Sequence, residues 1–289
     1  GIDAGGWGLN ITTEDIAKFG QLYLQKGKWE GKQLIPETWI DTATSFKISN
    51  GTDPNSDWNQ GYCYQFWRCR NNAYRGDGAF GQYCIVMPDQ DAVLAITAGM
   101  GDMQPPMNLI WEHLLPAMQS EPLPADPQAH AALTAKLSTL QLETIKGDAS
   151  SPTAERVSGQ VFKLDKNPDR IKSFRFEFNP AETVLIIDRA KGEQRIVCGS
   201  NVWARSEARF PPFDGSLRHG IPSDFHPWKI AASGAWADST TYAIKLWWSE
   251  TPLSLVLTCK FDGDRLTVEQ RGHVGFGPLQ GVTLTGQRL

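Results

Sequence analysis

Several features that define particular protein classes are missing from this sequence of 289 residues. No apolar run approaches the roughly 18–20 residues that cross a membrane, so no membrane span is expected. The net charge is −4 and the pI is about 5.8, which argues against a nucleic-acid partner because such proteins usually present a basic face. None of the five histidines pairs at the i, i+4 spacing of a helical zinc motif, so we expect no metal site and no cofactor.

Cysteine is scarce, and the odd number of five residues does not indicate a disulfide framework. Cys84, Cys198 and Cys259 lie within apolar strand patterns. Cys63 and Cys69 share one face of a strand-like run, but their separation along it is too large for one metal ion. We therefore predict buried, reduced thiols. This interpretation slightly favours a cytoplasmic location, although the sequence does not settle the compartment.

Residues 5–40 predict a Gly-rich strand end, a capped helix, a polar hairpin and a second helix, in that order. Thr12 or Thr13 is the expected N-cap of the first helix, and the apolar residues that follow recur at helical spacing. Gly27 is the expected left-handed residue after this helix, and Pro36 is expected to start the second helix.

Three strands and a closing helix are expected next. The strand patterns cover residues 62–69, 81–87 and 92–98, and the helix pattern covers residues 106–118. The last two strands are nearly continuously apolar and are joined by a Pro-Asp-Gln-Asp turn. Such runs predict central strands that are covered on both faces.

This order of elements resembles the C-terminal part of serine hydrolases of the bacterial β-lactamase-like superfamily, which includes class C β-lactamases, penicillin-binding D,D-peptidases and related esterases. The resemblance implies an α+β fold for residues 1–118, with an antiparallel sheet and helices. It also implies that the complete enzyme transfers the acyl group of a small-molecule ester, amide or β-lactam to a serine and then hydrolyses the acyl-enzyme.

The motifs that carry the reactive serine in that superfamily are not found here. The nucleophile lies in Ser-x-x-Lys, and no serine of this sequence has a lysine three residues later. All six tyrosines fail the second motif, Tyr-x-Asn, and its Tyr-x-Ser and Ser-x-Asn variants are missing too. We therefore assign no catalytic residue and expect the chain alone to be inactive. The expected partner is the N-terminal half of the hydrolase domain.

The segment from Arg75 to Gly81 holds the candidate substrate-binding residues. Gly76-Asp77-Gly78-Ala79-Phe80-Gly81 has the Gly-x-Gly-x-x-Gly spacing of dinucleotide sites, but a strand pattern follows it instead of the required helix. Aligned by that strand, Gly76-Asp77-Gly78 takes the place of the family's third motif, which is a basic residue, Ser or Thr, and Gly. The resemblance then implies that Ala79 offers its N–H to the oxyanion.

Two departures from the third motif qualify this hypothesis. Gly76 stands where the family has a basic residue, and Asp77 stands where it has a hydroxyl, so an esterase-like or amidase-like parent is favoured. Arg75 is the candidate source of the missing positive charge. A carboxylate beside an oxyanion would repel it, so Asp77 should point away or pair with Arg75. An ordinary hairpin turn remains the alternative interpretation of this segment.

The second half of the sequence predicts a different architecture. Residues 119–150 predict a Pro-rich linker with a short helix over 129–142. From residue 151 to residue 289, apolar and polar residues alternate in several short runs, which predicts a small antiparallel β-barrel or sandwich domain.

Tryptophan is enriched in this β domain, and it leaves a second function open. The residues are Trp203, Trp228, Trp236, Trp247 and Trp248. Exposed rings would form a platform for a ligand or a cell-surface polymer, and the chain would then be a non-catalytic binding module. Buried rings would instead indicate a structural core.

Overall fold

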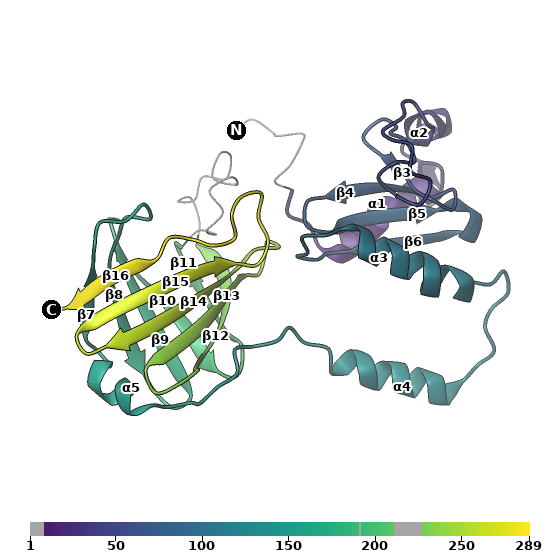
Figure 1. The fold of residues 1–289 in the computed structure, drawn as a ribbon. Coiled ribbons are helices and arrows are strands. Elements are labelled where there is room, and N and C mark those ends of the chain that lie inside the picture. Colours follow the sequence, from purple (N-terminus) through teal and green to yellow (C-terminus); the bar gives the residue numbers. More distant parts are fainter. Residues whose placement is uncertain (1–8, 191, 211–226) are drawn as a thin grey trace. The chain divides into compact units, whose positions relative to one another are not determined.

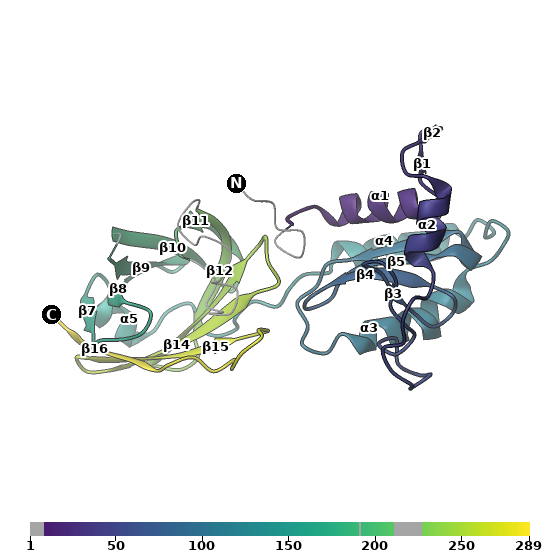
Figure 2. The same ribbon diagram turned by 90° about the horizontal axis from the view of Figure 1, so that it is seen from above.

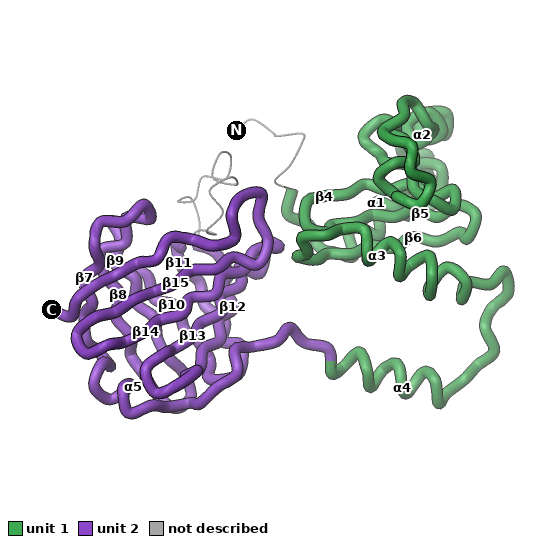
Figure 3. The backbone as a smooth tube through the Cα atoms, in the orientation of Figure 1, with its two compact units in different colours: residues 1–139 green, residues 140–289 purple. Residues whose placement is uncertain are grey.

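The computed structural model describes residues 9–190, 192–210 and 227–289. The chain forms two compact units, residues 1–139 and residues 140–289 (Figure 3). The first unit mixes helices with small antiparallel sheets, and the second contains a closed β-barrel, so the predicted α+β class with a barrel domain is confirmed at this level. The strand end expected at residues 5–8 lies outside the described residues.

The first unit begins with the predicted helix, hairpin and helix. Helix α1 spans Thr13–Leu24, and its N-cap is Thr12, whose hydroxyl accepts from the N–H of Asp15. The hairpin strands β1 (Lys28–Trp29) and β2 (Lys32–Gln33) follow, and α2 spans Glu37–Thr44.

The first left-handed residue after α1 is Lys26, one position before the predicted Gly27. Gly27 is also left-handed, and its N–H donates to the carbonyl of Leu22. A side chain at Gly27 would place its Cβ 2.1 Å from the carbonyl oxygen of Ile35. The glycine is therefore required by close backbone contact as well as by its φ angle.

Four antiparallel strands form the sheet of the first unit in the order β3-β4-β5-β6. Their bounds are Trp67–Arg68, Tyr74–Gly78, Gln82–Met87 and Ala92–Ile96. A one-turn 3-10 helix, η1 (Pro88–Gln90), joins the last two. The predictions for residues 81–87 and 92–98 are thus confirmed as strands.

Two predictions about these strands are wrong. Only Trp67–Arg68 of the run 62–69 is strand, because Gln65 is left-handed and the N–H of Cys63 donates to the carbonyl of Phe66, which closes a tight turn. The strand predicted as central at 92–98 is β6, the edge strand of the sheet among the described residues. Its residues are all half-buried rather than buried.

Helices cover both faces of this sheet (Figure 2). Tyr74 and Val86 pack with Tyr23 of α1 on one face. On the other face, the closing helix after β6 packs against Tyr83, Ile85 and Met87. Strand β5 is therefore buried on both sides, as its apolar run predicts.

The closing helix is less regular than the predicted helix over 106–118. It begins as α3 (Gln104–Leu109), continues as one π turn, η2 (Ile110–Leu114), and ends as a 3-10 turn, η3 (Leu115–Ala117). Helix α4 (Pro127–Ser138) follows and has no buried residue. It is shorter than the helix expected over 129–142.

The second unit is a nine-stranded barrel with one additional strand (Figure 1). Its strands are β7 (Val161–Leu164), β8 (Ile171–Phe178), β9 (Glu182–Arg189), β10 (Gly192–Ser200), β11 (Ala204–Ala208), β12 (Trp228–Trp236), β13 (Thr241–Trp248), β14 (Ser254–Asp262), β15 (Arg265–Gly272) and β16 (Leu284–Arg288). Neighbours are antiparallel, and a parallel pairing of β10 with β12 closes the barrel. The short helix α5 (Pro152–Val157) precedes β7.

Aromatic rings form much of the barrel's core. Phe178 contacts the rings of Phe176, Trp236, Tyr242 and Phe261 at centroid distances between 5.0 and 6.4 Å. The hydroxyl of Tyr242 bonds with that of Thr183, so its polar atom is satisfied within the core. These contacts make the region around Phe178 a packed core.

Candidate functional site

The predicted site residues form one continuous segment at the end of β4. Arg75, Gly76, Asp77 and Gly78 belong to β4, and Ala79 begins the turn to β5. Strand β3 pairs only with Tyr74 and Arg75. From Gly76 onward, the outer edge of β4 has no strand partner among the described residues.

The turn after Gly78 has the geometry of a three-residue hairpin connection. Gly78 pairs with Gln82, and the intervening Phe80 and Gly81 both have positive φ. The side-chain amide of Gln82 donates through Nε2 to the carbonyls of Ala79 and Ala98 and so stabilises this turn. The hairpin-turn interpretation is therefore correct as local geometry, and a binding role for the same backbone remains a hypothesis.

Gly76 leaves free space beside the strand. A Cβ built at this position meets no atom within 4 Å, whereas a Cβ at Gly78 would contact the side chain of Gln82. Glycine in a strand interior often marks a place where another molecule approaches the backbone closely. Of the two glycines of β4, Gly76 is thus the one with room for such an approach.

Arg75 and Asp77 form the predicted pair. Arg75 Nε donates to Asp77 Oδ2 at 2.8 Å, and the guanidinium lies 4.2 Å from the ring centroid of Trp58. Arg75 Nη1 also donates to the carbonyls of Asp57 and Arg68. The arginine side chain is 0% exposed. Its charge therefore compensates Asp77 inside the unit and does not reach the surface directly.

A buried carboxylate near this pair is the feature that the sequence did not reveal. Asp57 is 0% exposed and accepts from Arg70 through its backbone N–H, Nε and Nη2 at 2.8–3.0 Å. Gln104 Nε2 and Trp111 Nε1 donate to the same carboxylate at 2.9 and 3.0 Å. Burial alone would raise the pKa of Asp57, but these hydrogen bonds hold it below its ordinary value.

Asp57 therefore joins the loop before β3 to the closing helix. Asp57 lies 13 positions before Arg70 and 54 before Trp111 along the chain. No local sequence motif predicts this arrangement. Asp57 lies in a polar loop, and its hydrogen-bond donors are too distant along the chain to form a recognisable spacing. We interpret the cluster as structural, since its donors saturate the carboxylate.

The described residues contain no cluster of His, Cys, Asp or Glu that is arranged to hold a metal ion. His219 and His226, which flank a Pro-containing loop in the sequence, both lie outside the described residues. The side chain of His113, in the closing helix, is largely exposed. Within the same described part of the chain, no helix is both long and apolar enough to cross a membrane.

All five cysteines are free and buried, as predicted. The tryptophans of the second unit are divided: Trp228, Trp236 and Trp248 are buried, whereas Trp203 and Trp247 are half-buried. Both half-buried rings are near Lys245, whose Nζ is 6.0 Å from the ring centroid of Trp203 and 5.8 Å from that of Trp247. Most of these rings thus belong to the scaffold, which weakens the alternative of a tryptophan binding platform.

Comparison of the sequence with protein-family models and with curated proteins found no match. The functional interpretation therefore rests on the order of elements and on the residues of β4.

Proposed function

We propose that the first unit is the C-terminal part of a β-lactamase-like serine hydrolase domain. The complete enzyme would form an acyl-serine from an ester, amide or β-lactam and hydrolyse it. The observation that carries this proposal is the free outer edge of β4 at Gly76–Gly78, immediately before the Ala79 turn. The order of α1, the hairpin, α2, the antiparallel strands and the closing helix supports it.

In this proposal, β4 binds substrate through its backbone. The open space at Gly76 admits the substrate, and the N–H of Ala79 donates to the oxyanion that develops on the carbonyl oxygen. Arg75 neutralises Asp77, so the carboxylate adds little repulsion at the site. Arg75 is thus a positioning residue, because it is buried and does not contact the substrate.

The edge of β6 supports the proposal that the domain has a second part. Ala92, Leu94 and Ile96 pack against the cluster under α3, and Val93 packs against the cluster under α1. No described strand pairs with the outer edge of this apolar strand, and natural proteins usually cover or protect such an edge. We assign the free edge to the partner half of the hydrolase domain, which would also carry the nucleophile.

The test compares this chain with a longer polypeptide of the source protein that includes the residues before Gly1. A fluorophosphonate probe, nitrocefin and p-nitrophenyl esters are offered to both. We expect no labelling or turnover with the present chain, and labelling of a serine in Ser-x-x-Lys with the longer one. Labelling of a serine in the present chain, or a longer polypeptide without Ser-x-x-Lys, would contradict the proposal.

A further inference from the structure

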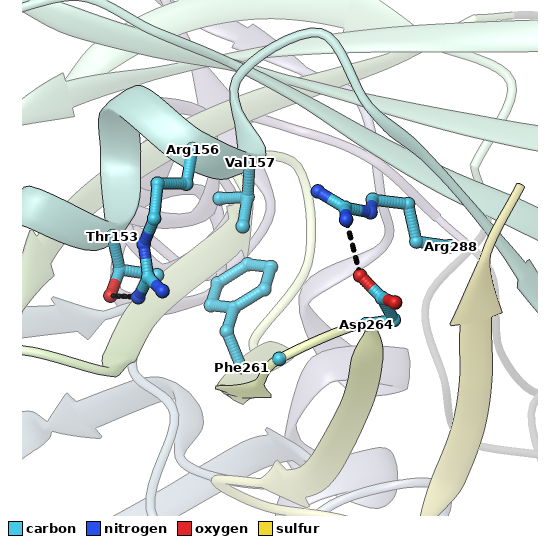
Figure 4. Close-up of a pocket in the computed structure, with 7 residues that line it drawn as sticks. Thr153, Arg156, Val157, Phe261, Asp264 and Arg288 are labelled. Carbon is cyan, nitrogen blue, oxygen red and sulfur yellow. Dashed lines mark hydrogen bonds and ion pairs between the residues drawn. The ribbon is translucent and has the colours of Figure 1, made fainter.

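A cavity of about 310 Å³ opens on the second unit. Figure 4 shows its wall, to which α5, the turn between β14 and β15, and the end of β16 contribute. Pockets for small molecules have volumes of roughly 300–1,000 Å³. The cavity is therefore at the lower end of the range and suits a small organic molecule.

One part of the cavity is apolar and rigid. Val157 is 2% exposed and Phe261 is 3% exposed, and the ring of Phe261 lies in the middle of the lining residues in Figure 4. The same ring packs against Phe162 and Phe176 at centroid distances of 5.5 and 5.4 Å. Because the barrel core holds this ring, the small part of it that faces the cavity is a preformed apolar surface.

Of the two arginines that line the cavity, one has a carboxylate partner and the other does not. Asp264 forms an ion pair with Arg288. Arg156 has no carboxylate partner among the described residues, and its Nη2 donates to the hydroxyl of Thr153 at 2.9 Å. Two arginines and one aspartate give the lining a net charge of +1. The cavity should therefore prefer an anion to a cation.

Thr153 is buried and fixes one side of the Arg156 guanidinium. Arg156 is exposed, and within the described part of the chain its other N–H groups have no hydrogen-bond partner, so they are available to a ligand. A guanidinium presents its donors in a planar fork that matches the two oxygens of a carboxylate. Polar recognition and apolar surface thus lie in the same cavity.

We infer that this cavity binds a small organic carboxylate, with the carboxylate on Arg156 and the apolar body on Phe261 and Val157. The inference concerns the second unit alone and does not depend on the proposed hydrolase function.

The test uses the full chain and four probes. Benzoate carries both a carboxylate and an apolar ring, acetate carries only the carboxylate, benzylammonium carries the opposite charge, and inorganic phosphate is an anion without an apolar body. Titrations followed by amide NMR shifts should show benzoate binding with a Kd of about a millimolar. The shifts should centre on Val157 and Gly263, with weaker effects of acetate and phosphate and none of benzylammonium.

Two variants at the cavity should change the affinity in opposite directions. Arg156→Gln should weaken benzoate binding by about tenfold or more, because it removes a charge-assisted hydrogen bond. Asp264→Asn should strengthen it, because it leaves Arg288 uncompensated. Arg195→Gln is the matched control, since Arg195 pairs with Glu177 on the barrel and does not line the cavity.

The inference is overturned if benzoate causes no shifts at the cavity, if phosphate or benzylammonium binds there as well as benzoate, or if Arg195→Gln weakens binding as much as Arg156→Gln. An unchanged affinity in Arg156→Gln with a native spectrum would overturn it as well.

Discussion

Arg75 and Asp77 lie two positions apart on the same face of β4, and the guanidinium Nε donates to the carboxylate at 2.8 Å. The arginine is fully buried, and its Nη2 has no hydrogen-bond partner among the described residues. Asp77 is therefore the anionic partner that makes a buried charge tolerable at this place.

Replacement of Asp77 by Ala should destabilise the first unit by about 3 kcal/mol, because it leaves the Arg75 charge buried without a carboxylate. Native-state hydrogen exchange of peptides from β4 and β5 measures this loss without interference from the barrel. Asp41→Ala is the control. Asp41 pairs with Lys26 at the surface, where a pair contributes only about 0–1 kcal/mol. Equal effects of the two substitutions would show that burial of Arg75 is not the cause.

The Asp57 carboxylate should make the first unit sensitive to acid. Its pKa in the folded protein lies below the ordinary value of 3.8. Its stabilising contribution is therefore complete above that value and is lost as the pH falls through the folded-state pKa. Asp57→Asn should be less stable than wild type at neutral pH, and the difference should shrink below about pH 4. A constant difference from neutral pH to pH 2 in urea titrations would contradict this assignment.

The thiols should be unreactive in the folded chain. Burial raises the pKa of Cys69 and Cys84 to about 11 and that of Cys198 to about 12. At pH 8 the thiolate, which is the reactive form, is then about one part in a thousand or less. Ellman's reagent should detect all five thiols only after denaturation. If the native chain rapidly released one equivalent of thionitrobenzoate, one thiol would be more accessible than this structure indicates.

In the complete enzyme, Ala79→Pro should reduce the acylation rate by roughly 10²–10³-fold, the usual effect of losing one oxyanion donor. Ala79→Gly keeps the N–H and is the matched control, with circular dichroism to verify that both variants fold. An unchanged rate in a folded Ala79→Pro enzyme would mean that this segment is only a hairpin turn.

Limited proteolysis tests the predicted domain boundary. The prolines and small polar residues of the segment 119–130 pack poorly, so brief digestion should cut there first. An earlier cut within 160–280, with the segment 119–130 still intact, would place the boundary elsewhere.

Local signals in the sequence predict much of this fold. The cap at Thr12, the apolar run of β5 and the alternation in β8 each depend on neighbouring residues, so their elements follow from short stretches of chain. The Arg75–Asp77 pair is predictable for the same reason, because residues two apart in a strand share a face.

Features that depend on distant contacts were not predictable. The apolar run of β6 does not reveal whether a strand lies on its outer edge, since central and edge strands differ in their partners. The donors of Asp57 are brought together only by the folded sheet and the closing helix. The left-handed Gln65 interrupts a strand-like run in which residue preferences favour extended backbone.

The composition of β6 also has a consequence for the behaviour of the isolated chain in solution. The sequence Ala-Val-Leu-Ala-Ile has no charge and no proline, and its register with β5 has no bulge. Charged residues, prolines and bulges are the features by which natural edge strands avoid pairing with other chains, and β6 has none of them. Among the residues that the structure describes, no strand pairs with the outer edge of β6, so in the isolated chain this edge is a template for intermolecular sheet extension.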